Sequence, residues 1–457
     1  MKLPFWPNPK GYRDIDFGLQ RVYDLLARLD NPHKKLPPTI HIAGTNGKGS
    51  TLSFLRAIFV EAGYSVSCYT SPHLVLFNER IVLNNKNISD KFLNECLKRC
   101  KQAASQHPEI AITYFEGITV AAFLAFSLTK SDVLLLETGM GGRLDATNAI
   151  DNNLLSIITP IAFDHTEFLG KTLGKIAFEK AGIFKKNCPV VIGKQKKSAL
   201  MVLKKQAAKL GCKVQAFDED WRVLKTNSTK SLAQNSTKIS TSNLKENFKE
   251  FSTWSFVAKT KTHTFATPSL QGAHQIENSS TAIAAVLLLQ KKFKITQAQI
   301  NSALQKTFWP ARLQKIESGK FFKILPKNYD LVLDGSHNPQ GATTLKSFLK
   351  SQKHERKIAV FSMLKDKDCA GFLATIKNEI DQLICLEIPG ESKSRSKEEI
   401  FKIATKLKIP ATIANNFDDA FKQISKTTTS KNPHQTLITI CGSLYLAGNF
   451  LEENEKT

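Results

Sequence analysis

The sequence has few features of secreted, disulfide-stabilised or membrane-spanning proteins. Its 457 residues include eight cysteines, none of them in a CxxC pair, so reduced thiols are expected rather than a disulfide framework. No apolar run reaches the roughly 18 residues that a transmembrane helix needs. The N-terminal residues MKLPFWPNPKGYRDID carry no apolar core of a signal peptide. These absences predict a cytoplasmic protein that does not span a membrane.

Acidic residues are scarce relative to basic ones, with 40 Asp and Glu against 64 Lys and Arg and a formal net charge of +24. Such an excess favours polyanionic partners: nucleic acid, a lipid surface, or phosphorylated and polycarboxylate small molecules. The 42% hydrophobic and 23% charged content is otherwise that of an ordinary globular enzyme. No repeat of fixed period is visible, so a solenoid is not indicated. The length predicts two domains.

An apolar strand over Thr39–Ala43, a glycine-bearing loop and a helix follow one another over residues 39–62. SVSCYTSPH adds a second strand and loop, and helices are expected over Asp90–Gln106 and Ile118–Leu128. DVLLLE and LLSIIT, at 132–137 and 154–159, are fully apolar strands of the kind found inside parallel sheets. This alternation predicts an α/β sheet covered by helices on both faces.

The composition changes to Ser, Thr, Asn and Lys between Lys225 and Phe251. This segment is interpreted as a surface insertion or an extended hairpin without a catalytic role. Helical periodicity returns over residues 279–291 and 297–306, and Pro310 then interrupts it. We place the domain boundary here, between residues 306 and 307.

The second half alternates strands and helices again. Strands are expected in DLVLDGSHNP, KIAVFSML, QLICLEIP and TLITICGS, with helices over Gly341–Leu349 and from Leu444. This pattern predicts a smaller Rossmann-like α/β domain.

The loop Gly44-Thr45-Asn46-Gly47-Lys48-Gly49-Ser50 lies between the first strand and its helix. Backbone N–H groups at a helix N-terminus, together with one lysine, can hold a polyphosphate. The loop departs from the general G-x-x-x-x-G-K-[ST] string, because Ile42 stands at the first glycine position and Gly49 follows the lysine. A simple glycine turn is the alternative. The position between a buried strand and a helix favours nucleotide binding and a P-loop ATPase domain.

Glu137 ends the apolar strand DVLLLE and is followed by TGMGGRLDATN. Ligands of α/β sheets bind at this carboxyl edge, and an acid there can hold a phosphate-bound magnesium ion. The alternatives are a helix N-cap or an ion pair with Arg143.

Asp164 and His165 follow the strand LLSIITPIAF. An isolated Asp-His pair is usually structural, but this is the third polar cluster predicted at the same sheet edge. We therefore interpret His165 as a metal or phosphate contact rather than a core histidine.

The remaining candidates lie further along the chain. Lys180 is in a helix, where a lysine is by default a solvated charge. Asp334, His337 and Asn338 follow the first predicted strand of the second half, and Arg312 follows the junction. An Asx turn and a surface cation are the alternatives for Asp334 and Arg312. Neither alternative accounts for both residues lying where two domains would meet, a favoured place for ligand sites.

Taken together, these segments closely resemble the folylpolyglutamate synthase family, including its bacterial bifunctional dihydrofolate synthase type, within the Mur ligase superfamily. The resemblance rests on HIAGTNGKGST, YTSPHL with FNERI, TYFEG, LLLETGMGGRLDATN, AFDHTEFLG, EKAGIF, WPARLQ, LDGSHNP, MLKDKD and CGSLYLAG. It runs from about Asp16 to Gly448. One departure is Ala311, which stands where bacterial members often have glycine.

The resemblance implies an ATP-dependent ligase that joins L-glutamate to a pteroate or folate. The γ-phosphate of ATP would pass to a substrate carboxylate, and the amine of glutamate would attack the acyl phosphate. The absence of an evident covalent nucleophile agrees with this chemistry. The implied cofactors are Mg²⁺ and ATP as co-substrate, with a monovalent cation as a further candidate. Residues 1–306 would form a Mur ligase central-type ATP-binding domain, and residues 307–457 a glutamate ligase domain.

The resemblance also implies roles for individual residues. Lys48, His165, Lys180 and His337 would be catalytic, with Lys180 carbamylated. Magnesium would be held by Ser71, Glu137 and His165, and the carbamate of Lys180 would help to hold a second metal ion. The remaining positions contact ATP or the pteridine side of the folate: Thr45, Asn46, Gly47, Lys48, Gly49, Ser50, Asn278, Arg312 and Asp334 for ATP, and Thr113, Tyr114, Phe115, Leu144, Asp145 and Ala146 for the pteridine.

Two other functions remain open from the residues alone. One is a Mur-type ligase acting on a peptidoglycan precursor, which the EKAGIF, NERI and GRLDATN contexts disfavour. The other is a nucleic-acid-binding P-loop NTPase, motivated by the net charge and disfavoured because no basic stripe with interleaved aromatic residues is present. We expect a monomer with small-molecule substrates and no nucleic-acid or membrane partner.

Overall fold

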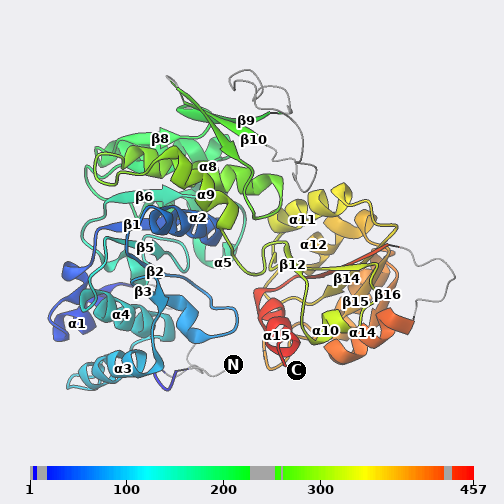
Figure 1. Ribbon diagram of the computed structural model, residues 1–457. Helices are drawn as coiled ribbons and strands as arrows, with labels where there is room; N and C mark the ends of the chain where they lie inside the picture. The colour runs from blue at the N-terminus through cyan, green and yellow to red at the C-terminus, as the bar shows by residue number, and fades with distance from the viewer. Residues whose placement is uncertain (1–3, 8–17, 227–252, 259–260, 427–434, 457) are drawn as a thin grey trace, which may run out of the picture.

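The computed structural model of the chain describes residues 4–7, 18–226, 253–258, 261–426 and 435–456. Two sheets, each covered by helices, lie side by side, and the N-terminal half of the chain forms the larger one (Figure 1). A small antiparallel sheet lies on the outer side of the larger half.

The larger sheet has eight strands in the order β4-β3-β2-β5-β1-β6-β7-β8. The six strands from β2 to β8 in this order are parallel to one another. Strands β3 and β4 are added at one edge by antiparallel pairing. The strands are β1 (Thr39–Ala43), β2 (Val66–Tyr69), β3 (Ile81–Leu83), β4 (Lys86–Asn87), β5 (Val133–Glu137), β6 (Leu155–Ile158), β7 (Val190–Ile192) and β8 (Val214–Ala216).

Helices cover both faces of this sheet because its central strands are apolar on both sides. Alternate residues of β5 enter different cores: Val133 and Leu135 pack with one helix layer, and Leu134 and Leu136 with the other. The helices of this half are α1 (Gln20–Arg28), α2 (Lys48–Glu61), α3 (Asp90–Ala104), α4 (Tyr114–Ser127), α5 (Thr166–Leu169), α6 (Leu173–Ala181), α7 (Lys197–Lys209), α8 (Ala273–Leu288) and α9 (Gln297–Lys306), with 3-10 turns η2 (Pro32–Lys35), η3 (Phe77–Arg80) and η4 (Ala146–Ala149).

A three-stranded antiparallel sheet packs on the layer of α8 and α9. It consists of β9 (Trp221–Thr226), β10 (Thr253–Ala258) and β11 (Thr262–Ala266). Its aromatic side chains Trp221, Trp254 and Phe256 join the same core as α8. The predicted Lys225–Phe251 insertion connects the paired strands β9 and β10 and, apart from its first two residues, lies outside the described residues.

The second large sheet has the order β12-β13-β17-β14-β15-β16, all parallel except β12. Its strands are β12 (Gln314–Ile316), β13 (Tyr329–Leu333), β14 (Arg356–Phe361), β15 (Gln382–Cys385), β16 (Ala411–Ile413) and β17 (Thr436–Cys441). Its helices are α10 (Lys320–Lys323), α11 (Pro339–Ser351), α12 (Cys369–Ile376), α13 (Lys397–Lys406), α14 (Phe417–Lys426) and α15 (Leu444–Asn454), with the turn η5 (Lys377–Glu379). The predicted α/β fold with a second, smaller sheet is therefore confirmed.

Element boundaries differ from the prediction where capping extends a helix. Helix α4 begins at Tyr114 rather than Ile118, because the hydroxyl of Thr113 and the carboxylate of Glu116 form a capping box. Strand β12 was not predicted, so Asp334 follows the second strand of the smaller sheet and not its first. The domain boundary stays a prediction. Helix α9 ends at Lys306 before it, and the next strand, β12, belongs to the other sheet.

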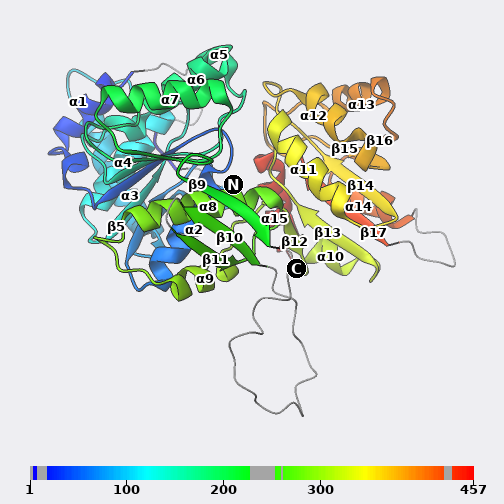
Figure 2. The same cartoon turned by 90° about the horizontal axis from the view of Figure 1, so that it is seen from above.

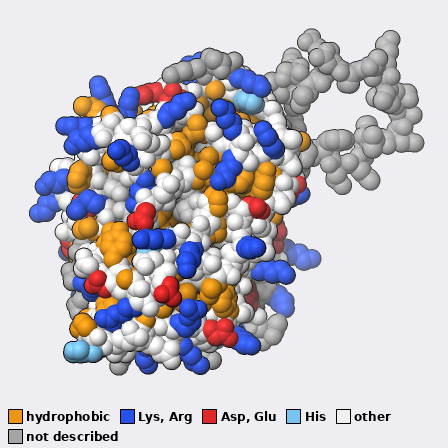
Figure 3. Space-filling model, turned by 90° about the vertical axis from the view of Figure 1, so that its left-hand side faces the viewer, with side chains coloured by type: hydrophobic (Ala, Val, Ile, Leu, Met, Phe, Trp, Pro, Cys, Tyr) orange, Lys and Arg blue, Asp and Glu red, His pale blue; other side chains and the backbone are white. Residues whose placement is uncertain are grey.

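Two general expectations can be compared with the structure. All eight cysteines are free, as predicted for reduced thiols. In the part of the chain that the structure describes, no helix is long and apolar enough to cross a membrane. On the face shown in Figure 3, Lys and Arg side chains are scattered among apolar and polar groups rather than gathered into one stripe.

Candidate active site

Polar loops that follow strands β1, β5 and β6 of the larger sheet meet the loop that follows β13 of the smaller one. Parallel strands bring these loops to one edge of each sheet. Figure 2 shows α5 on the side of the larger half turned toward α12. The site therefore lies where the two sheets meet.

The first loop, residues 44–47, joins β1 to α2 and is folded against the loop after β6. The N–H groups of Thr45 and Asn46 both donate to Pro160 O, at 3.0 and 3.1 Å. Gly44 has φ +152°, and a β-carbon there would clash with the hydroxyl of Thr159. Gly47 has φ +84°, and a β-carbon there would clash with Asn278. Both positions therefore need glycine.

Helix α2 begins at Lys48, and the side chain of this lysine folds back over the loop. Its Nζ donates to Gly44 O at 3.2 Å and to Thr45 O at 3.5 Å. Gly49 and Ser50 are buried behind it in the first turn of α2. A helix N-terminus with a lysine above it is the arrangement that binds phosphate groups.

The phosphate loop also touches the smaller half. Asn46 Oδ1 accepts from Asn338 Nδ2 at 3.0 Å, and Asn46 Nδ2 donates to Gln340 Oε1 at 2.6 Å. Asn338 is the N-cap of α11, with its Oδ1 accepting from Gly341 N. These amides link the start of α2 to the start of α11.

Glu137 ends β5 as predicted and is 5% exposed. Burial raises the pKa of its carboxyl, while the charges of Lys48 and Arg312 and a hydrogen bond from Ser71 N oppose the rise. The alternative ion pair is not formed, because Arg143 pairs with Glu179 at 3.1 Å. Glu137 is thus a buried carboxylate surrounded by cations.

Asp164 lies at the centre of a cluster that joins the two halves. Its Oδ1 is 2.7 Å from Lys367 Nζ, and these side chains are 11% and 10% exposed. The His337 and His165 Nε2 atoms lie 3.8 and 3.9 Å from its carboxylate oxygens. Burial alone would raise the pKa of Asp164, but His165, Lys367 and His337 outweigh it and hold that pKa well below its usual range.

Both histidines of this cluster are held neutral. Burial lowers the pKa of His165 to about 4, with Asp164 opposing the drop and Lys367 and Lys48 adding to it. Burial likewise lowers the pKa of His337, again with Asp164 opposing. Neutral imidazole nitrogens can bind a metal ion or accept a hydrogen bond.

Lys180 is buried, at 4% exposure, and the solvated position expected from helix periodicity is wrong. Its Nζ donates to Gly44 O at 2.9 Å, which links α6 to the phosphate loop. Burial lowers the pKa of Lys180 to about 7, with Lys48 adding to the drop and Asp164 and Asp145 opposing it. A fraction of this side chain is therefore an uncharged amine at neutral pH.

Arg312 and Asp334 come together at the junction. Asp334 Oδ2 accepts from Leu313 N at 3.1 Å, and Oδ1 accepts from Ser336 N at 3.0 Å. Burial lowers the pKa of Arg312, with Asp334 and Glu137 opposing. Ala311 and Leu313, on either side of the arginine, have φ +55° and +49°. This left-handed backbone explains why glycine suits position 311 and fixes the direction of Arg312.

The residues predicted for the pteridine lie at the start of α4 and in the loop that follows β5. The Phe115 ring in α4 lies against the backbone of Gly139, where a β-carbon would clash with it. Thr113 caps α4, and Tyr114 is buried beside it. The structure thus brings α4 against the loop that carries Leu144 and Ala146.

Asp145 has a clear role within that loop. Its Oδ1 accepts from Thr147 N and Oγ1 at 3.0 and 2.5 Å, and its Oδ2 accepts from Met140 N at 2.8 Å. Three hydrogen bonds shape the loop between β5 and η4, so Asp145 organises the backbone there. Its predicted contact with the pteridine stays a prediction.

Sequence reasoning missed Lys367 and Gln340. Lys367 stands in MLKDKD, directly after the predicted strand KIAVFSML, so its place at a strand's carboxyl end was visible in the sequence. Gln340 carried no such signal, because a glutamine at the start of a helix is usually solvated.

The described residues contain no group of three or more His, Cys, Asp and Glu side chains that could hold a metal ion. A smaller donor set still fits magnesium, which takes one or two carboxylates and keeps water and phosphate ligands. Glu137 supplies a buried carboxylate and His165 a neutral imidazole beside the phosphate loop.

Comparison with known proteins agrees with this geometry. Residues 42–286 match the family described as Mur ligase middle domain, and residues 317–453 match dihydrofolate synthetase, C-terminal domain. A curated relative, the dihydrofolate synthase/folylpolyglutamate synthase of Haemophilus influenzae, is 33% identical over 453 residues, covering 96% of this chain and 94% of the relative.

Solved structures are similar over nearly the whole chain. E. coli FolC in complex with DHPP and ADP has a TM-score of 0.79 and 28% identity, covering 96% of this chain and 93% of that one. A bifunctional folylpolyglutamate synthase/dihydrofolate synthase with Mn, AMPPNP and L-glutamate bound has a TM-score of 0.77 and 28% identity, covering 96% and 94%.

Proposed function

The chain belongs to the dihydrofolate synthase/folylpolyglutamate synthase family, and from this premise we propose that it accepts both dihydropteroate and reduced folates as acceptors of L-glutamate. It is an ATP-dependent ligase of this folate-type branch. Membership of this family argues against the Mur-type alternative that acts on a peptidoglycan precursor.

The observation that supports ATP-dependent ligation at this site most strongly is the position of Lys48. Its charge lies close enough to Glu137, His165 and Lys180 to affect the pKa of all three. Transfer of a phosphoryl group needs cations around the transferred oxygens and a fixed direction of attack, not a covalent nucleophile. Lys48 and Arg312 supply such cations near Glu137.

In the proposed reaction, residues 45–50 with Asn278, Arg312 and Asp334 hold ATP across the two halves. The carboxylate of the pteroate or folate attacks the γ-phosphorus, ADP leaves, and the amine of L-glutamate displaces phosphate from the acyl phosphate. His337, beside Asp164, would orient the glutamate side of the reaction. The pteridine would lie against Phe115, Leu144 and Ala146. We propose residues 1–306 as the ATP-binding domain and 307–457 as the ligase domain.

A bound Mg²⁺ would neutralise phosphate charge in this site, and we propose Ser71, Glu137 and His165 as its ligands. Replacing Glu137 with glutamine is expected to raise the Mg²⁺ concentration for half-maximal ligation by about tenfold or more, since losing a supporting ligand costs about 10- to 100-fold in metal affinity. Titration of the rate with MgCl₂ measures this. Glu61→Gln, far from the site and paired with Lys306, is the control, and an unchanged titration in E137Q would remove Glu137 from the set.

We propose that Lys180 is carbamylated, as the family resemblance implies. The amine of Lys180 would add CO₂ and release one proton, which requires the uncharged amine and is therefore favoured above about pH 7. Removing bicarbonate is expected to lower the ligation rate, and Lys180→Ala to lower it at least about tenfold, with partial rescue by acetate. A ¹³C-bicarbonate-derived carbamate signal should appear in the wild type and not in Lys180→Ala. No signal and no bicarbonate dependence would contradict the proposal.

The function itself is tested by paired ligation assays. Purified protein is incubated with MgATP and L-glutamate, with dihydropteroate in one tube and tetrahydrofolate in the other. The products are identified by mass spectrometry. Product in both tubes is the expected result. Product in one alone would restrict the enzyme to that acceptor, and product in neither would overturn the proposal.

The same preparation tests the remaining expectations. We propose a cytoplasmic monomer that binds no polynucleotide, and a monovalent cation as an additional cofactor. Light scattering gives the mass in solution, and ATP hydrolysis with and without polynucleotide tests the nucleic-acid alternative. Stimulation of hydrolysis by polynucleotide, with a steep dependence on salt, would favour that alternative.

A further inference from the structure

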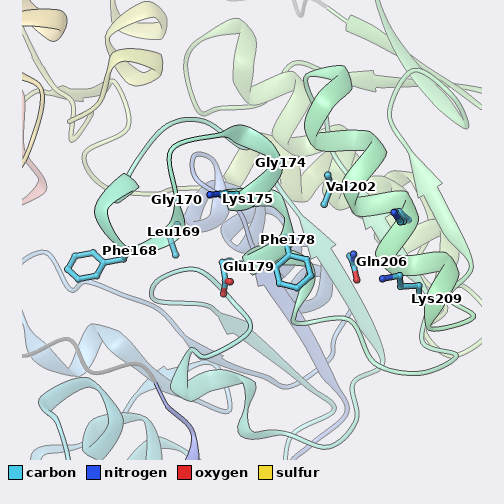
Figure 4. Close-up of a pocket in the computed structure, with 11 residues that line it drawn as sticks. Phe168, Leu169, Gly170, Gly174, Lys175, Phe178, Glu179, Val202, Gln206 and Lys209 are labelled. Atoms are coloured by element: carbon cyan, nitrogen blue, oxygen red, sulfur yellow. The ribbon is translucent and has the colours of Figure 1, made fainter.

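A second hollow of the molecule lies outside the site described above, between α6 and α7. It has a volume of about 490 Å³ and is open to solvent (Figure 4). Figure 4 shows Phe178 of α6 facing α7 across it, with Lys175 on the same helix and Lys209 on α7 at the rim. We call it the α6–α7 groove.

The groove combines an apolar floor with a cationic rim. Phe178 is 43% exposed there although it is a large aromatic side chain, and Leu169 forms part of the floor. Lys175, Lys205 and Lys209 line the rim. None of the three forms an ion pair with another described residue, whereas their neighbour Lys204 pairs with Glu219 at 2.8 Å. Such a surface suits an anion that also carries aliphatic or aromatic groups.

The groove adjoins both parts of the proposed site. Gly141, in the loop assigned to the pteridine, lies so close that a β-carbon on it would be 2.9 Å from Leu169 and 3.9 Å from Glu179, two residues that line the groove. Arg143 of the same loop pairs with Glu179 and stands 5.9 Å from the Phe178 ring. Glu179 directly precedes Lys180, which contacts the phosphate loop.

From this arrangement we propose that the α6–α7 groove binds the oligoglutamate tail of folates that already carry several glutamates. The inference rests on the proposed function. A ligase that extends a glutamate chain must hold the growing end at Lys48 and the pteridine at Phe115. The distance between these two places stays the same, so the added glutamates must lie outside the direct path between them. The neighbouring groove, with its cationic rim, accommodates that excess.

The spacing of the lysines fits such a tail. Lys205 and Lys209 are four residues apart on α7, which places them about 6 Å apart along the helix axis. A γ-linked glutamate has five backbone bonds per residue where an ordinary peptide has three, so its carboxylates recur at about 6 Å when extended. Successive tail carboxylates can therefore pair with successive lysines while their methylenes lie on Phe178.

The test compares two substrates that differ only in the tail, tetrahydrofolate with one glutamate and with five. In the variant Lys205→Gln/Lys209→Gln, the KM for the pentaglutamate is expected to rise about five- to tenfold while the KM for the monoglutamate changes less than about twofold. The products made from the monoglutamate should also be shorter. The matched control, Lys197→Gln/Lys204→Gln, removes two charges from the same helix outside the groove.

The outcomes separate this inference from the proposed function. Equal changes of KM for both substrates, or none, would overturn the tail subsite. So would a wild type that ligates glutamate to dihydropteroate but does not extend a folate that carries a tail, although the ligase would then stand. A wild type that forms no product from any acceptor would overturn the proposed function itself.

Discussion

Replacing Lys48 with alanine is expected to lower kcat for ligation by about 10³-fold, equivalent to about 4 kcal/mol of activation free energy. The ammonium of Lys48 lies at the phosphate loop, where the transferred group would be held, and its hydrogen bonds within the protein go to two backbone carbonyls. Removing one preorganised charge of this kind typically costs about 10²- to 10³-fold. The measurement is steady-state ligation with saturating ATP and folate.

The fold should survive this change, which makes the loss interpretable. The side chain of Lys48 is half-buried and belongs to no apolar core cluster. Trp309 lies against Gly49 and offers a fluorescence signal for nucleotide bound at the start of α2. Binding of ADP is expected to persist with kcat reduced, and an exposed lysine changed in the same way, Lys196→Ala, should be unaffected. Turnover near the wild-type rate in K48A would remove Lys48 from phosphoryl transfer.

The central strands and the phosphate loop could be read from the sequence because their local signals agree. Residues 39–43 are apolar, the next residues include glycines, and α2 follows with helical periodicity, so β1 was predicted with its observed bounds. Strand β12 was missed because three residues, Gln314–Ile316, give too short a pattern. Its position depends on pairing with β13, which is a tertiary contact.

The sequence predicted a site residue most readily where that residue lies at the end of an apolar strand. Glu137 and Asp334 follow apolar strands and were found directly. Lys180 was not, because helix periodicity cannot reveal that the phosphate loop folds over α6 and buries its ammonium against Gly44. The place of Lys367 after a strand was visible in the sequence, but its contact with Asp164 depends on the meeting of the two sheets, which no local pattern encodes.

The contact between Asp164 and Lys367 is expected to stabilise the pairing of the two halves. Breaking a buried ion pair from one side leaves an uncompensated charge and costs about 3–5 kcal/mol, whereas removing both charges costs less. We therefore expect Lys367→Met to lower the free energy of unfolding by about 3 kcal/mol at pH 7. The double variant Asp164→Asn/Lys367→Met should be less destabilised than this single variant.

The pH dependence of this stability has a definite sign. The pKa of Asp164 is held below its unfolded value, so the pair contributes stability above about pH 4 and loses it as the pH falls through the folded-state pKa. The difference between wild type and Lys367→Met should therefore be largest near pH 7 and shrink below pH 4. Urea unfolding at both pH values measures it, and a difference independent of pH would argue against the ion pair.

The Asp164–Lys367 pair is also expected to determine where kcat falls at acid pH, because both residues affect the pKa of His165. A histidine must be neutral to hold a metal ion, and Lys367 helps to keep the pKa of His165 low while Asp164 opposes it. Lys367→Met leaves Asp164 unopposed, so the pKa of His165 rises and the acid limb of kcat against pH moves to higher pH. Asp164→Asn removes the opposing charge and should move that limb to lower pH. A purely structural loss would lower both profiles without moving them in opposite directions. Profiles of the two variants at saturating MgATP therefore decide whether the cluster tunes His165, the proposed metal ligand, or only joins the two halves.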